Sequence, residues 1–189
     1  MIKKPKREEI EEIVKLHLAS LKEGALYHLG KNVLKIFYEE ILDDGDSFIL
    51  AYKSGINTLG VAASTKDVEA LFSKIKKKHF ARIAFNVLKK SLANPKLPLK
   101  LLQKYPSEIK AELLFLFVDA SQRGKGIGEK LVAATSREFI ARGVYKYKIT
   151  ILSSNLRGKK FYERIGFRKT QTYSSLGEKR DIYAYTIKE

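Results

Sequence analysis

The stretch "SQRGKGIGEKL", residues 121–131, decides the fold class of this chain. It alternates glycines with cations between an apolar run and an amphipathic one: Gly124, Gly126, Gly128, Arg123 and Lys125. Two common phosphate loops are excluded, because Glu129 stands where a P-loop and a dinucleotide fingerprint each need another residue. A looser glycine-rich turn is left, which either binds an anion or only connects a strand tightly to a helix.

The segments around this turn predict a single mixed α/β domain over residues 1–189. Apolar residues at helical spacing predict helices over residues 6–22 and 32–42, and "SFILAY" and "NTLGVAAS" flank a turn and predict a hairpin. Residues 66–104 have helical periodicity and many lysines. "AELLFLFV", residues 111–118, is nearly all apolar and predicts a strand buried on both faces. A helix, a strand, a short helix and a closing hairpin follow the glycine turn.

Composition narrows the function classes. The chain has 189 residues and no cysteine, so disulfides and cysteine-ligated metals are excluded, and no His, Asp or Glu grouping has the spacing of a metal site. The first 16 residues lack the apolar core of a signal peptide and no apolar run could span a bilayer, so we expect a cytoplasmic protein. The net charge of +16 is compatible with nucleic acid, an anionic membrane, an anionic small molecule, or a lysine-rich solvated surface.

The predicted position of the turn favours anion binding. It follows the carboxyl end of a central strand and opens a helix, so its glycines allow backbone N–H groups to point at one ligand, with the positive end of the helix dipole behind them. A pyrophosphate could be held there by the main chain alone, with Arg123 and Lys125 adding charge at the rim.

Two segments of the sequence, taken together, resemble the motifs of a known protein family. "FVDASQRGKGIGEKLV", and "NLRGKKFYERIGF" some thirty residues later, resemble the motifs of the GNAT superfamily of acetyl-CoA-dependent N-acetyltransferases. The second string matches at Asn155, Phe161, Tyr162, Gly166 and Phe167, with Gly158 where alanine is usual. The resemblance implies the GNAT fold, in which central strands of a mixed, mostly antiparallel sheet splay apart beside the loop, and acetyl-CoA as cosubstrate without a metal.

By resemblance, the cosubstrate contacts fall on the strand before the loop, on the loop and on the next helix. They are Leu116, Phe117, Val118, Gln122, Arg123, Gly124, Lys125, Gly126, Ile127, Gly128, Asn155 and Tyr162. The implied activity is direct transfer of an acetyl group to a primary amine. The strand supplies an N–H to the thioester oxygen, which is an oxyanion type of stabilisation.

Tyr162 and Glu112 are the expected catalytic residues. Tyr162 aligns with the tyrosine that many members use as general acid, although packing in a short helix would also explain it. Glu112 lies six residues before Val118, where the histone-modifying branch carries its general base, although a charge at a strand end is also common. Other members carry a glutamate at the position that matches Thr150, and its absence leaves Glu112 or bulk water as the base.

The acceptor is left open by the sequence. A metabolite, an amino sugar, a protein N-terminus or a lysine would all supply the amine, and the acceptor could be anionic. A polyanion-binding module that kept only the fold is the rival of another class, but nucleic acid is not expected, because no exposed aromatics are interleaved with the basic residues. His17 and His28 are minor candidates for the acceptor site, His17 more simply as a packed core residue. The closing hairpin, a common pairing surface in the family, could form a homodimer.

The insert over residues 66–104 is longer than the fold needs. Its predicted apolar faces carry Val68, Leu71, Phe72 and Ile75, and then Phe80, Ile83, Ala84, Val87 and Leu88, and its polar faces carry seven basic residues from Lys74 to Lys90. We expect a helical pair packed on the sheet. A cap over the acceptor cleft that favours an anionic acceptor is the functional hypothesis built on it, and attachment to an anionic membrane is a further alternative.

Overall fold

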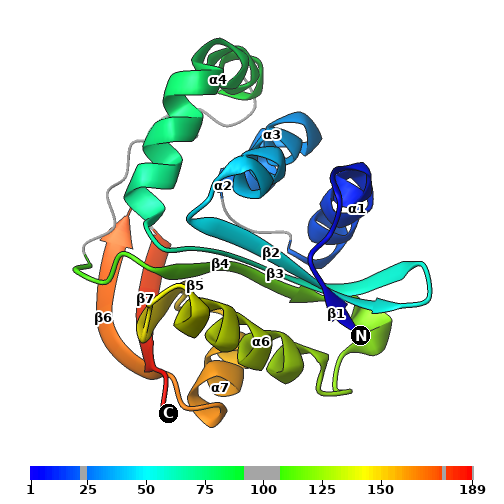
Figure 1. The fold of residues 1–189 in the computed structure, drawn as a ribbon. Helices are drawn as coiled ribbons and strands as arrows, with labels where there is room; N and C mark the ends of the chain where they lie inside the picture. Colours follow the sequence, from blue (N-terminus) through cyan, green and yellow to red (C-terminus); the bar gives the residue numbers. More distant parts are fainter. Residues whose placement is uncertain (22–24, 92–106, 176–177, 189) are drawn as a thin grey trace.

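The computed structural model describes residues 1–21, 25–91, 107–175 and 178–188. Figure 1 shows a twisted sheet with α1–α4 on one face and α6 and α7 on the other. The seven strands are ordered β1-β2-β3-β4-β5-β7-β6, and only β4 and β5 pair in parallel. The expected mixed, mostly antiparallel α/β architecture is confirmed.

The chain enters through β1 (Ile2–Lys3), a 3-10 turn η1 (Arg7–Glu9), and three helices: α1 (Ile10–Ser20), α2 (Ala25–Leu29) and α3 (Lys31–Asp43). The sequence predicted neither β1 nor α2. Two residues of β1 are too short to show an alternating pattern, and α2 has only five residues, so neither could be recognised from periodicity. The hairpin β2 (Ser47–Ser54) and β3 (Asn57–Thr65) is where the sequence placed it.

Two apolar clusters lie on opposite faces of the sheet. One joins α1, α3 and the start of α4 to the sheet and includes Val14, Leu34 and Phe37. The other joins α6 (Ile127–Ala141) to the opposite face and includes Leu131, Phe139 and Tyr147. Burial of such side chains contributes about 1.5–3 kcal/mol each, so both helix layers are held firmly to the sheet.

The central strand β4 (Glu112–Val118) is bulged and only partly buried. Its pairing with β3 shifts after Ala63, where Phe115 lies opposite Ala63 and Leu113 opposite Ser64, so Leu114 is the extra residue. Leu114, Phe115 and Leu116 are half-buried, and the expectation of a strand buried on both faces is wrong for them. They border a cavity, so the apolar run reflects both core packing and the lining of a site.

The neighbour of β4 leaves it after a single pair. Glu112 of β4 pairs with Lys148 of β5 (Lys146–Leu152), and beyond that pair β5 continues along β7 (Glu178–Thr186) rather than β4. The two strands therefore diverge in a V that opens toward the glycine turn. This is the splay that the resemblance implied, and α7 (Leu156–Arg164) and β6 (Arg168–Ser175) complete the fold.

The described part of the insert is one kinked helix, α4 (Val68–Ser91), and residues 92–104 of the insert lie outside the described residues. Its first half packs as expected, with Val68, Leu71 and Ile75 buried. The backbone leaves helical geometry at His79, whose Nε2 lies 2.8 Å from Glu40 Oε1 on α3. The kink changes which side of the second half meets the body of the protein.

Only part of the expected second apolar face of α4 is covered. Ile83 and Val87 pack against Leu29 of α2 and Val33 of α3, so this half lies on those helices and not on the sheet as expected. Phe80, Ala84 and Leu88 are exposed, so the expectation is wrong for them. The sequence pattern assumed a straight helix, and the change of direction at His79 presents a narrower stripe to α2 and α3.

Candidate active site

A cavity of about 1000 Å³ fills the V between β4 and β5. One wall is formed by the end of β4, the glycine turn, the start of α6 and the side of α7, and the other by α1, the first half of α4, β5 and β7. After the roles that the sequence resemblance implies, we call the first the cofactor wall and the second the acceptor wall. Every residue expected to contact the cosubstrate or to act in catalysis lines this cavity except Lys125, which lies in the turn beside it.

The glycine turn has the geometry of an anion site. Asp119 Oδ1 accepts the Ser121 N–H at 2.8 Å and shapes the approach, and Gly124 and Gly126 have φ of 82° and 73°, which side chains rarely adopt. Gly126 is the N-cap of α6, so the first N–H groups of this 15-residue helix are not used within it. They are available to a ligand at the positive end of the helix dipole.

The space at the turn fits a pyrophosphate. A Cβ added to Gly124 or to Gly126 would meet no heavy atom within 4 Å, so the backbone there borders open space. Around it, Lys125 Nζ donates to Gln122 Oε1 at 2.9 Å, and Arg123 Nε donates to the Val118 carbonyl at 3.2 Å. Open backbone, free N–H groups and two cations are the donor set that a phosphate requires.

Strand β4 offers backbone groups to the same cavity. The Asp119 N–H donates to the carbonyl of Leu59 on β3, at 2.9 Å. Because N–H groups alternate in direction along a strand, those of Leu116 and Val118 point to the opposite side, into the V. The Phe117 N–H points towards β3, and its side chain is buried in the α1 and α3 cluster.

The turn before α7 explains two residues of the second string. Asn155 is the N-cap of α7, and its Oδ1 accepts the Gly158 N–H at 2.9 Å, which leaves its side-chain NH₂ for a ligand. At Gly158, a Cβ would come within 2.5 Å of Ile151 Cδ1 on β5. Because that atom is the end of a flexible side chain, alanine would fit only after a shift of Ile151, so the close packing of α7 on β5 favours glycine without requiring it.

Tyr162 lines the cavity from α7. Its ring is half-buried and packs edge-on against Phe161 and Phe167, with centroids 5.1 and 5.2 Å away. Burial raises the pKa of the Tyr162 phenol above its usual range, so the hydroxyl keeps its proton at neutral pH. The group can donate a proton to an atom inside the cavity.

Glu112 lies at the closed end of the V, where its side chain is only 7% exposed. Burial raises the pKa of the Glu112 carboxyl, and the ammonium of Lys148, whose Nζ lies 3.4 Å from Glu112 Oε2, opposes that rise. Thr150 is two residues further along β5 and also lines the cavity. Glu112 thus reaches from β4 to the neighbourhood of Thr150, the position that the sequence resemblance matched to a glutamate.

The two histidines have different settings. His17 is 1% exposed and lines the acceptor wall; its Nδ1 lies 2.7 Å from the Tyr38 hydroxyl, and its ring packs on Phe115 and Phe117. Burial lowers the pKa of His17 to about 4, so the ring is neutral at neutral pH. His28 packs edge-on against Tyr27 on α2 and does not line the cavity.

The cavity also contains charged residues that the sequence analysis did not single out. Arg157, Lys160 and Arg164 lie on one side of α7 at helical spacing, and Arg180 comes from β7. Arg164 is paired with Glu129 at 2.7 Å. The spacing i, i+3, i+7 could have indicated that the three cations share a face, but not that this face borders a cavity.

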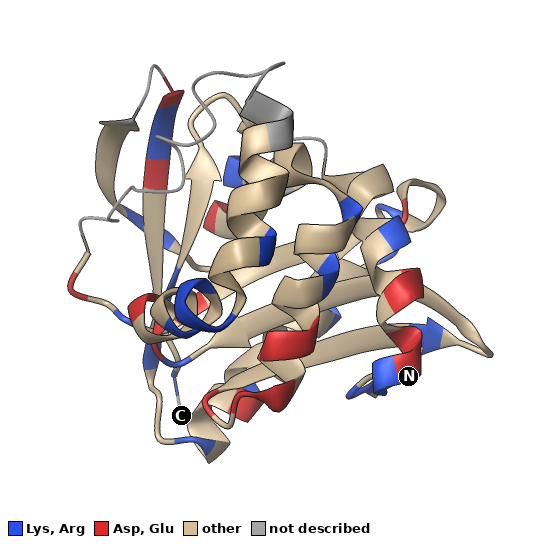
Figure 2. Ribbon diagram, turned by 90° about the horizontal axis from the view of Figure 1, so that it is seen from above, with Lys and Arg blue, Asp and Glu red and all other residues tan. Residues whose placement is uncertain are grey.

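Two possible features are not found in the described part of the chain. No three His, Cys, Asp or Glu side chains there are grouped to hold a metal ion. None of the helices described is both long and apolar enough to cross a membrane. Seen from the α1–α4 side in Figure 2, Lys and Arg are spread over several elements rather than gathered in one stripe.

Comparison with known proteins agrees with this geometry. Residues 103–182 match the family model described as "Acetyltransferase (GNAT) domain". No curated protein matches the chain. The fold is similar to that of the ribosomal-protein-S18-alanine N-acetyltransferase from Escherichia coli, with a TM-score of 0.64, 13% identity, and coverage of 100% of this chain and 94% of the other.

Two further solved structures have the same fold. An N-acetyltransferase from Staphylococcus aureus Mu50 has a TM-score of 0.66 and 18% identity, and 100% of this chain and 98% of that one are covered. PaiA N-acetyltransferase from Thermoplasma acidophilum, solved in complex with coenzyme A, has a TM-score of 0.63 and 15% identity, with 98% of each chain covered. At these identities the likeness concerns the fold alone.

Proposed function

Residues 103–182 form a GNAT acetyltransferase domain, and on that premise we propose that the protein transfers an acetyl group from acetyl-CoA directly to a primary amine. The observation that carries the proposal is the V between β4 and β5, which ends at a glycine turn with open backbone and at the N-terminus of α6. An elongated ligand with a pyrophosphate at one end and a reactive group at the other fits this shape. The complex of PaiA with coenzyme A shows such a ligand on a similar fold.

In this proposal the cofactor wall binds coenzyme A in three places. Backbone N–H groups of residues 124–128, with Gln122, Arg123 and Lys125, hold the pyrophosphate. The main chain of Leu116 and Val118 pairs with the pantetheine arm as an added strand would, while Phe117 supports that edge through its side chain. Arg157 and Lys160 line the cavity without an ion pair to any other described residue, so we assign them to the 3′-phosphate, and the Asn155 amide binds the arm near α7.

The chemical step needs one base and one acid. The Glu112 carboxylate accepts a proton from the acceptor's ammonium group, and the free amine nitrogen forms a bond to the thioester carbon. The Leu116 N–H stabilises the negative charge that develops on the thioester oxygen, an effect typically worth about 10²–10³ in rate. The carbon–sulfur bond then breaks, and the Tyr162 hydroxyl donates its proton to the departing sulfur. The extra proton on the new amide nitrogen passes to the Tyr162 oxygen, and Glu112 releases the proton it accepted to solvent, so both groups are restored.

The acceptor is an amine that enters between α1, α4 and β7. Two solved structures of similar fold are named ribosomal-protein-alanine N-acetyltransferases, so peptide N-termini belong among the candidates beside small amines and amino sugars. The acceptor wall contains Lys76 and Arg180 as well as Glu69 and Glu178, so it could bind an acceptor that carries charges of both signs.

The test is an acetyl-CoA turnover assay against a panel of small amines, amino sugars and peptide N-termini. We expect release of coenzyme A with one class of acceptor and a rise in melting temperature with acetyl-CoA alone. At acetyl-CoA about 100-fold above its dissociation constant, linkage stabilises the fold by roughly 2.7 kcal/mol. A melting temperature that acetyl-CoA leaves unchanged would remove the basis of the proposal.

A further inference from the structure

The closed end of the V contains a buried ion pair. Glu112 and Lys148 are the one residue pair through which β4 and β5 contact each other as strands, and the Lys148 N–H donates to the Ala111 carbonyl at 3.0 Å. The Lys148 side chain is 1% exposed and that of Glu112 is 7% exposed. A lysine this deeply buried is rare, because an ammonium without a partner is costly to remove from water.

Lys148 is held in one place by groups on both sides. Its Nζ donates to the Ile109 carbonyl just before β4 and lies 3.4 Å from Glu112 Oε2. Removal of the ammonium would leave the carboxylate buried without its partner. The local arrangement therefore couples the charge of Glu112 to that of Lys148 more closely than an exposed pair would.

Two buried oxygens, Glu112 Oε2 and Thr150 Oγ1, lie beside this pair. Neither makes a well-formed hydrogen bond within the described residues, although Glu112 Oε2 lies 3.4 Å from Lys148 Nζ and the Thr150 side chain helps to lower the pKa of the Glu112 carboxyl. Both residues line the cavity. An amine with several N–H groups would satisfy both atoms, and unsatisfied buried polar atoms are uncommon enough to indicate such a role.

The other charged groups around Glu112 come from three elements. Arg180 on β7 is near enough to favour the ionised carboxylate, but it is paired with Glu178 at 3.0 Å. Glu69 and Lys76 line the cavity from α4 and are exposed, so solvent screens them. His17 on α1 is neutral at neutral pH, because its burial lowers its pKa to about 4. Lys148 is thus the dominant charge on Glu112.

We infer that Lys148 is a positioning residue that keeps the Glu112 carboxylate oriented and ionised for removal of a proton from the acceptor amine. The inference rests on the proposed function, because it assumes that Glu112 is the base. It assigns Lys148 an effect on the pH dependence of the reaction, in addition to joining the two strands.

The test uses Lys148→Met, which keeps the length of the side chain and removes the charge. We expect the acidic limb of the kcat/KM profile to move to higher pH by about 1–3 units, since loss of an adjacent opposite charge raises a carboxyl pKa by that much. NMR titration of the Glu112 carboxyl should show the same movement without any turnover. Lys53→Met is the matched control, because Lys53 forms a part-buried ion pair with Glu9 away from the cavity.

A double variant separates positioning from a merely structural role. If Lys148 acts through Glu112, Lys148→Met should slow the enzyme little further once Glu112→Gln is present. Equal slowing at every pH, with the Glu112 titration unmoved, would overturn the inference and leave Lys148 as a strand connector. If Lys148→Met does not fold, the titration of Glu112 in the wild-type protein decides. Ionisation below about pH 7 supports the inference, and a carboxyl still protonated there overturns it.

The inference and the proposed function fail in different ways. Wild-type rates in Glu112→Gln would remove Glu112 as the base and end the inference, although acetyl transfer itself would stand. Absence of both turnover and acetyl-CoA binding in the wild-type protein would end the proposed function. If Glu112→Gln slows the reaction as expected but the pH profile of kcat/KM in Lys148→Met does not shift, the inference fails and the proposed function stands.

Discussion

The two walls of the cavity are built in different ways. The cofactor wall comes from continuous stretches of chain, residues 116–128 and 155–164, in which backbone groups and helix ends make most of the site. The acceptor wall combines single side chains from α1, α4, β5 and β7, which are far apart in the sequence. A site made of backbone groups tolerates most side-chain changes except at its glycines, whereas a site made of side chains is altered by each substitution. Mutations in the two walls should therefore affect binding in different ways.

The largest expected effect is on the cofactor wall. Gly126→Val should abolish most of the roughly 2.7 kcal/mol of stabilisation by acetyl-CoA, because a branched side chain would fill the open space beside the turn. Differential scanning fluorimetry with and without acetyl-CoA measures this. Gly143→Val is the matched control, since Gly143 has nearly the same φ, 74° against 73°, and an equally open Cβ direction but lies outside the cavity. Equal loss in both variants would mean that backbone strain, not blocked binding, is the cause.

The second effect lies where the walls meet. Tyr162→Phe should lower kcat by something on the order of 10²-fold while the dissociation constant of acetyl-CoA changes little, because only a proton donor is lost. Steady-state kinetics with calorimetric binding tests it. Tyr185→Phe, which alters another half-buried ring stacked on Phe167, should leave kcat unchanged. Normal turnover in Tyr162→Phe would assign that tyrosine to packing.

A smaller effect should distinguish specific binding of the 3′-phosphate by two cations from a general effect of positive charge on cofactor binding. Arg157→Ala with Lys160→Ala should weaken binding of coenzyme A by about tenfold or more and that of dephospho-coenzyme A much less, because a charge-assisted contact contributes about 1.5–3 kcal/mol. Isothermal titration calorimetry with both ligands measures the difference. Arg137→Ala with Lys146→Ala removes the same charge from exposed positions outside the cavity. An identical loss of affinity for both ligands would show that the two cations do not bind the 3′-phosphate.

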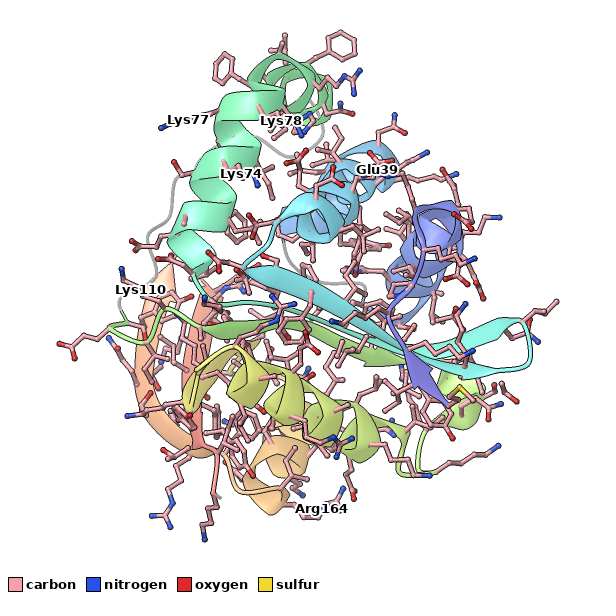
Figure 3. All side chains as sticks on the ribbon, viewed as in Figure 1. Glu39, Lys74, Lys77, Lys78, Lys110 and Arg164 are labelled. Carbon is pink, nitrogen blue, oxygen red and sulfur yellow. The ribbon has the colours of Figure 1, made fainter. Side chains whose placement is uncertain are left out.

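The smallest effect is expected on the acceptor wall. Lys76 lines the cavity, whereas Lys77 lies on the outer side of α4 and points away from the body of the protein (Figure 3). If the acceptor is anionic, Lys76→Gln should raise its KM a few-fold and weaken the salt dependence, and Lys77→Gln should do neither. The KM of acetyl-CoA should be the same in both variants. If the acceptor KM is the same in the two variants, Lys76 does not interact with the acceptor and is an ordinary solvent-exposed lysine.

The sequence predicted the local structure of the glycine turn and of the start of α7 well, because the signals for both are local. A glycine turn between a strand and a helix, and an asparagine that caps the next helix, carry their geometry in consecutive residues. The first half of α4 was predicted for the same reason, as its apolar residues recur at helical spacing. The second half was not, because the helix kinks at His79, and the contact that His79 makes there, with Glu40, is 39 residues away in the chain and leaves no local signal.

The sequence by itself determined the α/β class, the order of the main elements, the glycine turn and the placement of Tyr162, since each depends on periodicity or on spacing within a few residues. Only the tertiary structure decided that Leu114 is a bulge, that β4 and β5 separate after Glu112 and Lys148, and that Thr150 lies in the cavity beside that pair. It also decided that Arg157 and Lys160 border a cavity rather than solvent alone. These features arise where strands and helices from distant parts of the chain meet, and their geometry depends on contacts that no local pattern contains.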